Sequence, residues 1–182
     1  AGMQASIVLD ERGHDVTLFE AADKIGGQLN MAAVIPGKEE FHGMLGYFAR
    51  MIELSTVTVR LNTRASVNDL DGFDEVIVAT GVTPRDPGIE GQDHPKVLSY
   101  IDVLAGKAEV GEKVAVIGAG GIGFDVTEFL VQEHPSPTVN VEEWLEEWGV
   151  GDPEKVPGGL AAQGPKPSAP ARQVTLLQRK AS

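Results

Sequence analysis

The sequence predicts an α/β fold in which two incomplete βαβ units follow each other along the chain. Two observations support this prediction. Residues 1–20 have the pattern of an amphipathic helix followed by a strand that ends in an acid. Residues 113–130 have the pattern of a strand, a glycine-rich turn and a helix, and residues 173–178 resume as a strand. Each half of the chain therefore contains part of a parallel-sheet unit.

The glycine-rich turn is the most informative stretch of the sequence. Val114–Ile117 is a short apolar run typical of a buried parallel strand, and Phe124–Leu130 continues with apolar residues at helical intervals. Between them Gly118, Gly120 and Gly123 have the G-x-G-x-x-G spacing, which in this strand-to-helix context is typical of dinucleotide binding. The first glycine allows a tight turn, the second lets a pyrophosphate approach the backbone, and the third lets the helix pack on the strand. The alternative is a glycine turn without a ligand.

The first unit is predicted from its second half. Residues 1–12 are expected to form a helix, and Asp15–Glu20 a strand whose last residue, Glu20, occupies the position that binds ribose hydroxyls in such units. Gly2 resembles the last glycine of a fingerprint, so we expect a first strand and a glycine turn upstream of Ala1. The alternative for Glu20 is a solvated acid at the end of a strand.

Further elements fill the segment between these two motifs. We expect a helix over residues 38–53, strands over 57–61 and 74–79, and a short helix over 100–104 that Ser99 caps. The strand over 74–79 runs into a small residue and a glycine, which is how a sheet brings backbone close to a ligand, so Ala79 and Gly81 are candidate cofactor contacts. A Pro- and Gly-rich linker over 82–98 divides the chain into a partial first domain, residues 1–88, and a partial second domain, residues 89–182.

The second domain contains a Pro- and Gly-rich excursion over residues 134–171, in which Val141–Trp148 is expected to form a short acidic helix. The strand over 173–178 then ends in Arg179 and Lys180 instead of an acid. Two cations at the position that faces the adenosine ribose favour a 2′-phosphate, and hence NADPH over NADH. The alternative is a solvated basic end.

Composition excludes several classes of function. A net charge of −12 argues against a nucleic-acid surface, and the absence of cysteine excludes a cysteine-ligated cluster within these residues. No apolar run approaches the length of a membrane span and no leader pattern is visible, so we expect a cytoplasmic protein without a membrane partner. The four histidines have no metal-ligand spacing, and no nucleophilic triad or other catalytic residue is assigned.

Several segments together resemble the C-terminal part of bacterial NADPH-dependent 2,4-dienoyl-CoA reductases, which belong with the old yellow enzyme and trimethylamine dehydrogenase group. The segments are IGGQLN, IPGKEEF, HPKVLSYIDVL, VIGAGGIGFD and LLQRKAS. The resemblance covers nearly the whole chain and loosens over residues 134–171. It implies two Rossmann-like FAD- and NAD(P)-binding units of the glutathione and thioredoxin reductase type, both incomplete.

The resemblance also implies an activity and its cofactors. In that family NADPH passes a hydride to FAD, and electrons continue through a 4Fe-4S cluster to FMN in an N-terminal barrel, where a dienoyl-CoA of unsaturated fatty acid oxidation is reduced. The barrel and the cluster ligands are not among these residues, so activity of this chain alone is not expected. The residues implied to contact FAD are Glu20, Gly26, Gly27, Gln28, Lys38 and Thr63, and those implied to contact NADPH are Gly118, Gly120, Gly121, Gly123, Arg179 and Lys180.

Two other readings stay open. The chain is equally compatible with another member of the same group that acts on an amine or a different enone, because the missing barrel would select the substrate. A non-catalytic nucleotide-binding module is the alternative from a different class. The expected partners are the nucleotide cofactors and the rest of the parent polypeptide. We expect the FAD affinity to suffer more than the NADPH affinity, because the first unit lacks its glycine turn and the second keeps one.

Overall fold

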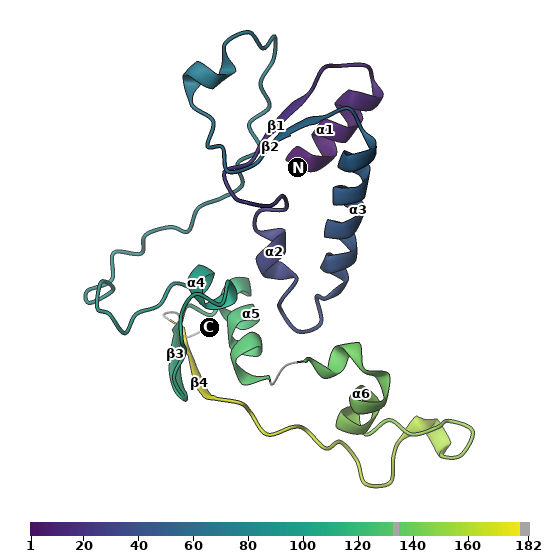
Figure 1. Ribbon diagram of the computed structural model, residues 1–182. Helices are drawn as coiled ribbons and strands as arrows, with labels where there is room; N and C mark the ends of the chain where they lie inside the picture. Colours follow the sequence, from purple (N-terminus) through teal and green to yellow (C-terminus); the bar gives the residue numbers. More distant parts are fainter. Residues whose placement is uncertain (133–134, 179–182) are drawn as a thin grey trace. The chain divides into compact units, whose positions relative to one another are not determined.

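Figure 1 shows the computed structural model of the chain, which describes residues 1–132 and 135–178. Residues 1–33 and 40–92 form unit 1, and residues 34–39 together with the chain from residue 93 onward form unit 2. None of the described helices is long and apolar enough to cross a bilayer. The helices and strands are, in chain order, α1 (Gly2–Glu11), β1 (Thr17–Phe19), α2 (Leu29–Ala32), α3 (Glu40–Leu54), β2 (Thr58–Arg60), η1 (Val67–Leu70), α4 (Tyr100–Leu104), β3 (Lys113–Ile117), α5 (Gly121–Val131), η2 (Pro137–Val139), α6 (Val141–Trp148), η3 (Pro157–Gly159) and β4 (Gln173–Leu177).

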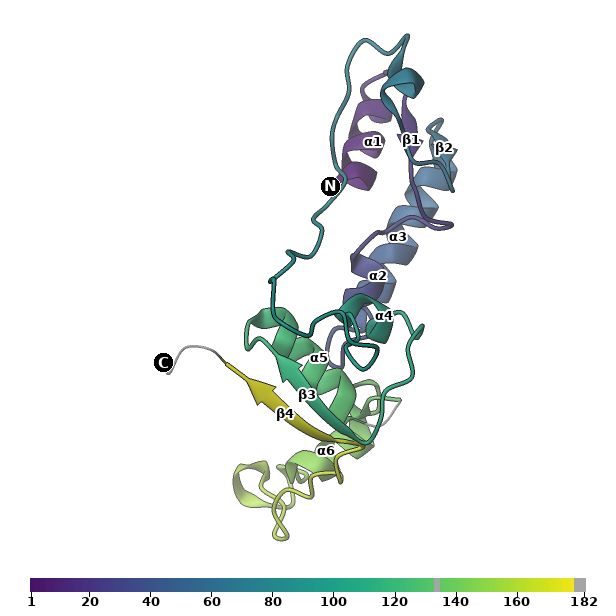
Figure 2. The ribbon, with the colours of Figure 1, turned by 90° about the vertical axis from the view of Figure 1, so that its left-hand side faces the viewer.

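Unit 2 is built on a βαβ arrangement. Strands β3 and β4 pair in parallel, from Lys113 opposite Gln173 to Ile117 opposite Leu177, and α5 packs on both (Figure 2). The short helix α4 packs on α5, and Ser99 Oγ accepts a hydrogen bond from the amide of Asp102 at its start, as predicted. The predicted strand, turn and helix around the glycines are therefore confirmed.

The sheet of unit 2 is buried on one face only. Val114, Val116 and Val174 pack against a core of Val103, Val126 and Leu130, whereas the alternate residues of both strands are exposed. The expectation that Val114–Ile117 would be a fully buried strand is wrong, because among the described residues α5 covers only one face of a two-stranded sheet.

Unit 1 combines a second parallel strand pair with three helices. Strand β1 pairs with β2, from Thr17 opposite Thr58 to Phe19 opposite Arg60, and α1 packs against β1 and α3. The helix α2 also packs on α3. Ile7 of α1 and Ile52 of α3 are buried between these elements. The predicted helices over 1–12 and 38–53 and the predicted strands over 15–20 and 57–61 are confirmed, with shorter strands.

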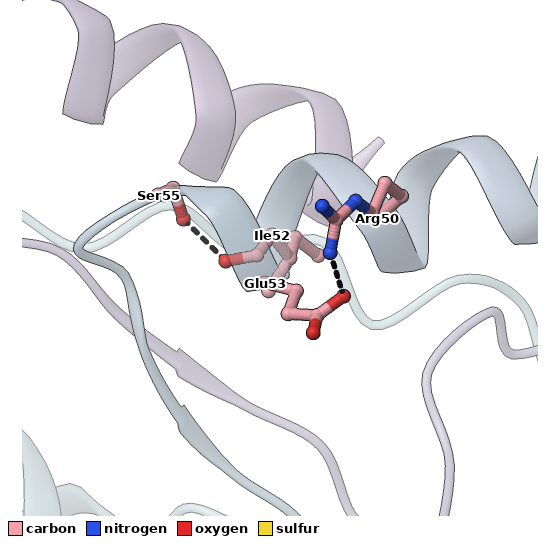
Figure 3. Close-up of polar contacts among 4 residues, drawn as sticks. All are labelled: Arg50, Ile52, Glu53 and Ser55. Atoms are coloured by element: carbon pink, nitrogen blue, oxygen red, sulfur yellow. Dashed lines mark hydrogen bonds and ion pairs between the residues drawn. The ribbon is translucent and has the colours of Figure 1, made fainter.

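The end of α3 is fixed by local hydrogen bonds, which Figure 3 shows. Ser55 Oγ donates to the carbonyl oxygen of Ile52 at 2.7 Å, which satisfies one of the carbonyls that lack a partner at a helix C-terminus. Arg50 Nη1 and Glu53 Oε2 form an exposed ion pair at 2.7 Å. An exposed pair of this kind adds about 0.5 kcal/mol or less, so the hydroxyl cap and the buried Ile52 define this end of the helix.

The strand predicted over residues 74–79 does not form. This segment has no ladder partner among the described residues, and Val76, Ile77 and Val78 are all exposed. An apolar, β-branched run becomes a strand only when a neighbouring strand pairs with it, so high strand propensity alone does not produce one here.

The excursion over residues 134–171 is folded where it is described. Asn140 Oδ1 caps α6 by accepting from the amides of Glu142 and Glu143, and Gly149 ends the helix in the left-handed region at φ 65°. A side chain at Gly149 would lie 2.5 Å from the backbone of Gly164, so the returning chain requires glycine there. The predicted helix over 141–148 is confirmed.

Candidate functional site

The glycine turn between β3 and α5 has the backbone geometry that its spacing predicts. Gly118 has φ 114°, a conformation that other residues rarely adopt. A Cβ added to Gly123 would lie 1.7 Å from the carbonyl oxygen of Gly118, so the first turn of α5 packs directly on the strand end. These two glycines are therefore required by the fold itself.

Gly120 and Gly121 differ from that pair, because the space beside them is open. A Cβ added to either residue would meet nothing within 4 Å, and neither has a positive φ. Gly120 is the N-cap residue of α5, and no side chain caps the helix, so the first amides of α5 are available to an anion. The open space is the part of the turn that a diphosphate would fill.

A pocket of about 340 Å³ adjoins this turn at the carboxyl end of β3. Ligands of parallel α/β sheets bind at this edge, beyond the carboxyl ends of the strands. The amide of Gly118 donates to the carbonyl oxygen of Leu177 at 2.9 Å, so β4 ends beside the same turn. The residues lining the pocket are Tyr100, Val116, Ile117, Gly118, Gly120, Gly121, Ile122, Gly123 and Val126.

Lys38, which we expected near a flavin, forms an ion pair within unit 2. Its Nζ lies 2.7 Å from Oδ2 of Asp125, and the two side chains are 37% and 33% exposed. Asp125 belongs to α5 and follows the last glycine of the turn by two positions. Asp125 was not predicted as a site residue from the sequence. Its place next to the glycine motif was a usable signal, but a contact between residues 38 and 125 cannot be read from spacing.

A second polar contact joins the same segment to η2. Thr138 Oγ1 donates to Oε1 of Glu39 at 2.6 Å and accepts from the amide of Gly37 at 3.3 Å. Partial burial raises the pKa of Glu39, but the hydrogen bonds from Thr138 and from the backbone amides of Glu39 and Gly37 outweigh it, so the pKa lies below its usual value. Segment 34–39 is thus held to unit 2 through charged and polar groups.

In unit 1 the structure brings Glu20 and Thr63 together at the carboxyl ends of β1 and β2. Oε1 of Glu20 accepts from the amide of Ala22 at 2.8 Å, and the amide of Thr63 donates to the carbonyl oxygen of Glu20 at 2.9 Å. The carboxylate therefore lies at the sheet edge where ligands of parallel sheets bind. This placement fits a ribose contact, which stays a prediction.

The loop predicted to approach the flavin is shaped by its glycine pair. Gly26 and Gly27 have φ 113° and 52°, and a Cβ at Gly26 would lie 2.5 Å from Cδ2 of Leu45. Gln28 Nε2 donates to the carbonyl oxygen of Val82 at 2.7 Å. Val82 directly follows Gly81, another glycine with a positive φ, at 74°. Gln28 and Gly81 are therefore close together, whereas Lys38 groups with unit 2.

Gly2 and Ala79 are also brought together. A Cβ added to Gly2 would lie 3.4 Å from Cβ of Ala79, so α1 begins close to the segment that follows the unformed strand. Arg179 and Lys180, the predicted 2′-phosphate contacts, lie outside the described residues.

Comparison with known proteins identifies the group to which these features belong. The family profile described as pyridine nucleotide-disulphide oxidoreductase matches residues 1–142. Cinnamate reductase of Clostridium sporogenes is 37% identical over 141 residues, which are 76% of this chain and 21% of that protein. N,N-dimethylglycine/sarcosine dehydrogenase of Chromohalobacter salexigens is 38% identical over 124 residues, which are 63% of this chain and 18% of that protein. The chain thus spans about a fifth of the length of these relatives.

Two solved structures share the fold. Histamine dehydrogenase from Rhizobium sp. 4-9 matches with a TM-score of 0.60 and 27% identity, over 71% of this chain and 21% of that chain. A 2-naphthoyl-CoA reductase complex matches with a TM-score of 0.69 and 24% identity, over 97% of this chain and 31% of that chain. At that identity the second match supports the fold alone.

Proposed function

We propose, from the premise that this chain belongs to the pyridine nucleotide-disulphide oxidoreductase family, that it is the FAD- and NADPH-binding part of a 2,4-dienoyl-CoA reductase. Domains of this family bind FAD and a nicotinamide nucleotide, and the two relatives are a reductase and a dehydrogenase. The observation that carries the proposal is the β3–α5 turn, where Gly118 is required by its positive φ and Gly123 by close packing, while the space beside Gly120 is open.

The residues of unit 2 fit a dinucleotide. The uncapped amides at the start of α5 would donate to the pyrophosphate, and the absence of a side chain at Gly120 and Gly121 lets it approach. Tyr100 and Val116 line the adjoining pocket. When bound, NADPH supplies the hydride that a flavin accepts. Arg179 and Lys180 are proposed to select NADPH by pairing with its 2′-phosphate.

In unit 1 the proposed FAD contacts are the carboxylate of Glu20, the neighbouring Thr63, and the Gly26–Gln28 loop. The carboxylate oxygens of Glu20 would accept hydrogen bonds from ribose hydroxyls. The resemblance also implies Lys38 as a flavin contact, and in the structure its ammonium group is paired with Asp125.

The substrate proposal rests on the sequence resemblance. The remainder of the protein would supply an FMN barrel and a 4Fe-4S cluster, with the residues that protonate the substrate, so this chain holds no catalytic residue of that step. We place the protein in the cytoplasm, with no nucleic-acid or membrane partner.

Oxidation of an N-methylated amine is the second candidate function, because a dehydrogenase of such substrates is 38% identical to this chain over 124 residues.

A substrate panel tests the proposal. The complete reading frame that contains this chain would be expressed. NADPH oxidation would be followed at 340 nm with 2,4-dienoyl-CoA or cinnamate as the electron acceptor. In the reverse direction, NADP⁺ reduction would be followed with dimethylglycine as the electron donor. Reduction of the dienoyl-CoA in preference to cinnamate is the expected result. Turnover of dimethylglycine alone would replace the proposal with the amine dehydrogenase reading. Absence of NADPH oxidation with every acceptor, with NADPH still bound, would favour a non-catalytic module.

A further inference from the structure

A second pocket lies in unit 2, away from the glycine turn. Its volume is about 450 Å³, which is in the range of small-molecule sites in proteins. Two of its lining residues, Val110 and Arg172, come shortly before β3 and β4 in the chain, so the pocket adjoins the amino ends of both strands (β3 and β4 in Figure 2). It shares no lining residue with the pocket at the glycine turn. We call it the Arg172 pocket.

Most of the lining of the Arg172 pocket is apolar and belongs to packed structure. Val103 and Leu130 are core residues of unit 2, and Val110 packs against that core. Lining residues that are held by a core keep the shape of a pocket when no ligand is bound. The Arg172 pocket is therefore suited to the apolar body of a small molecule.

Arg172 brings a positive charge into this apolar lining. Its Nη1 donates to the carbonyl oxygen of Leu130 at 3.3 Å, close to the C-terminal end of α5. That bond uses one of the five N–H donors of a guanidinium group. Arg172 is partly buried and has no ion-pair partner among the described residues. The remaining donors have the planar fork geometry that matches a carboxylate.

Glu109 also lines the pocket and limits the charge that a ligand can carry. It forms no ion pair with Arg172, and it is exposed, so water screens its carboxylate. The chain as a whole has a net charge of −12, which repels anions of high charge. A ligand with a single negative charge pairs with Arg172 and meets the least repulsion.

We propose that the Arg172 pocket binds a small monocarboxylate that has an apolar body. The carboxylate would pair with the guanidinium of Arg172, and the hydrocarbon would contact Val110 and Leu130. Inorganic phosphate has no apolar body to fill such a lining, and a nucleotide carries more negative charge than this pocket favours. The proposal does not depend on the dinucleotide site.

Three probes with the same hydrocarbon body test the charge preference. They are 4-phenylbutyrate, the neutral 4-phenylbutanamide and the cationic 4-phenylbutylamine, each titrated into the isotopically labelled chain and followed by amide NMR. We expect the carboxylate to bind about tenfold more tightly than the amide, because the amide forms no charge-assisted hydrogen bond with Arg172. The largest shifts are expected over residues 106–110 and at Arg172. Added NaCl should weaken binding of the carboxylate.

Two variants test the charge and the space separately. Arg172→Gln should weaken binding of 4-phenylbutyrate about tenfold and change that of the amide less than about twofold. Ala108→Leu places a larger side chain in the lining and should weaken both probes about fivefold. It keeps Arg172, so it tests the pocket even if loss of the hydrogen bond to Leu130 unfolds Arg172→Gln.

The matched control is Arg50→Gln, which removes an exposed cation from unit 1 and should change the affinity for 4-phenylbutyrate less than about twofold. Far-UV circular dichroism checks that each variant is folded.

Four results would overturn the proposal. The first is equal affinity for the carboxylate and the amide, and the second is tighter binding of the amine, which would assign the pocket to a cation held by Glu109. The third is a set of shifts confined to the glycine turn, residues 118–123. The fourth is the absence of any shift with the carboxylate at about 10 mM, where a ligand of this size bound in a formed pocket is detected.

Discussion

Gly123→Ala should destabilise unit 2 strongly. The added methyl carbon would lie 1.7 Å from the carbonyl oxygen of Gly118, about half of an ordinary carbon–oxygen contact distance. That oxygen belongs to backbone, and the amide of Gly118 is itself bonded to Leu177 on β4, so relief requires α5 to move off the sheet. Overpacking of this kind costs about 3 kcal/mol, a large fraction of the stability of a small domain.

The control is Gly121→Ala, which makes the same chemical change two residues earlier in α5. A Cβ at Gly121 meets nothing within 4 Å, so the substitution should be neutral or should stabilise by up to about 1 kcal/mol through helix propensity. Both variants would be unfolded in urea and followed by far-UV circular dichroism. If Gly123→Ala unfolds at the same urea concentration as Gly121→Ala, the close packing of α5 on the end of β3 is wrong.

Three further predictions concern the rest of the molecule. Lys38→Gln removes the partly exposed ion pair with Asp125 and should lower the free energy of unfolding in urea by about 1 kcal/mol or less. Arg50→Gln removes a more exposed pair and should have no measurable effect in the same titration. The pKa of Glu39 is lowered by folding, so its stabilisation is present above its ordinary value of 4.5 and is lost as the pH falls below that value. Glu39→Gln should therefore cost about 1 kcal/mol near pH 7 and less in acid, once the carboxyl is protonated in both the folded and unfolded states, and a cost that does not change with pH would contradict this assignment. Val78→Asp changes a side chain that is 80% exposed and should alter stability by about 0.5 kcal/mol or less, and a loss above about 2 kcal/mol would mean that the segment is paired after all.

Sequence patterns predicted the elements whose formation depends on neighbours in sequence. The amphipathic spacing in α3, the Ser99 cap of α4 and the acidic turn of α6 are local signals, and each element forms where it was expected. Residues 74–79 have a clear strand pattern but no ladder partner among the described residues. Strand pairing depends on residues far away in the sequence, so the composition of one segment does not predict it.

The candidate site was predictable to the same extent. The spacing of Gly118, Gly120 and Gly123 predicted a tight turn and a close approach of helix to strand. The structure has a positive φ at Gly118 and the close approach at Gly123. The contact between Lys38 and Asp125 was not predictable, because it joins residues that are 87 positions apart and depends on how segment 34–39 packs in unit 2. The burial of strand β3 was also overestimated, because it depends on which elements cover the β3–β4 sheet, and this is a non-local property as well.

Calorimetric titration of the chain with NADPH and with NADH tests the central claim most directly, with Gly120→Ala as the matched variant. The methyl group of that variant fits the folded chain, because nothing lies within 4 Å, but it would occupy the space left for a pyrophosphate. We predict that NADPH binds more tightly than NADH and that Gly120→Ala lowers the NADPH affinity about tenfold or more without changing the fold. Equal affinity for the two nucleotides would contradict the 2′-phosphate role of Arg179 and Lys180, and NADPH binding that is unaffected by Gly120→Ala would contradict the turn as the nucleotide site.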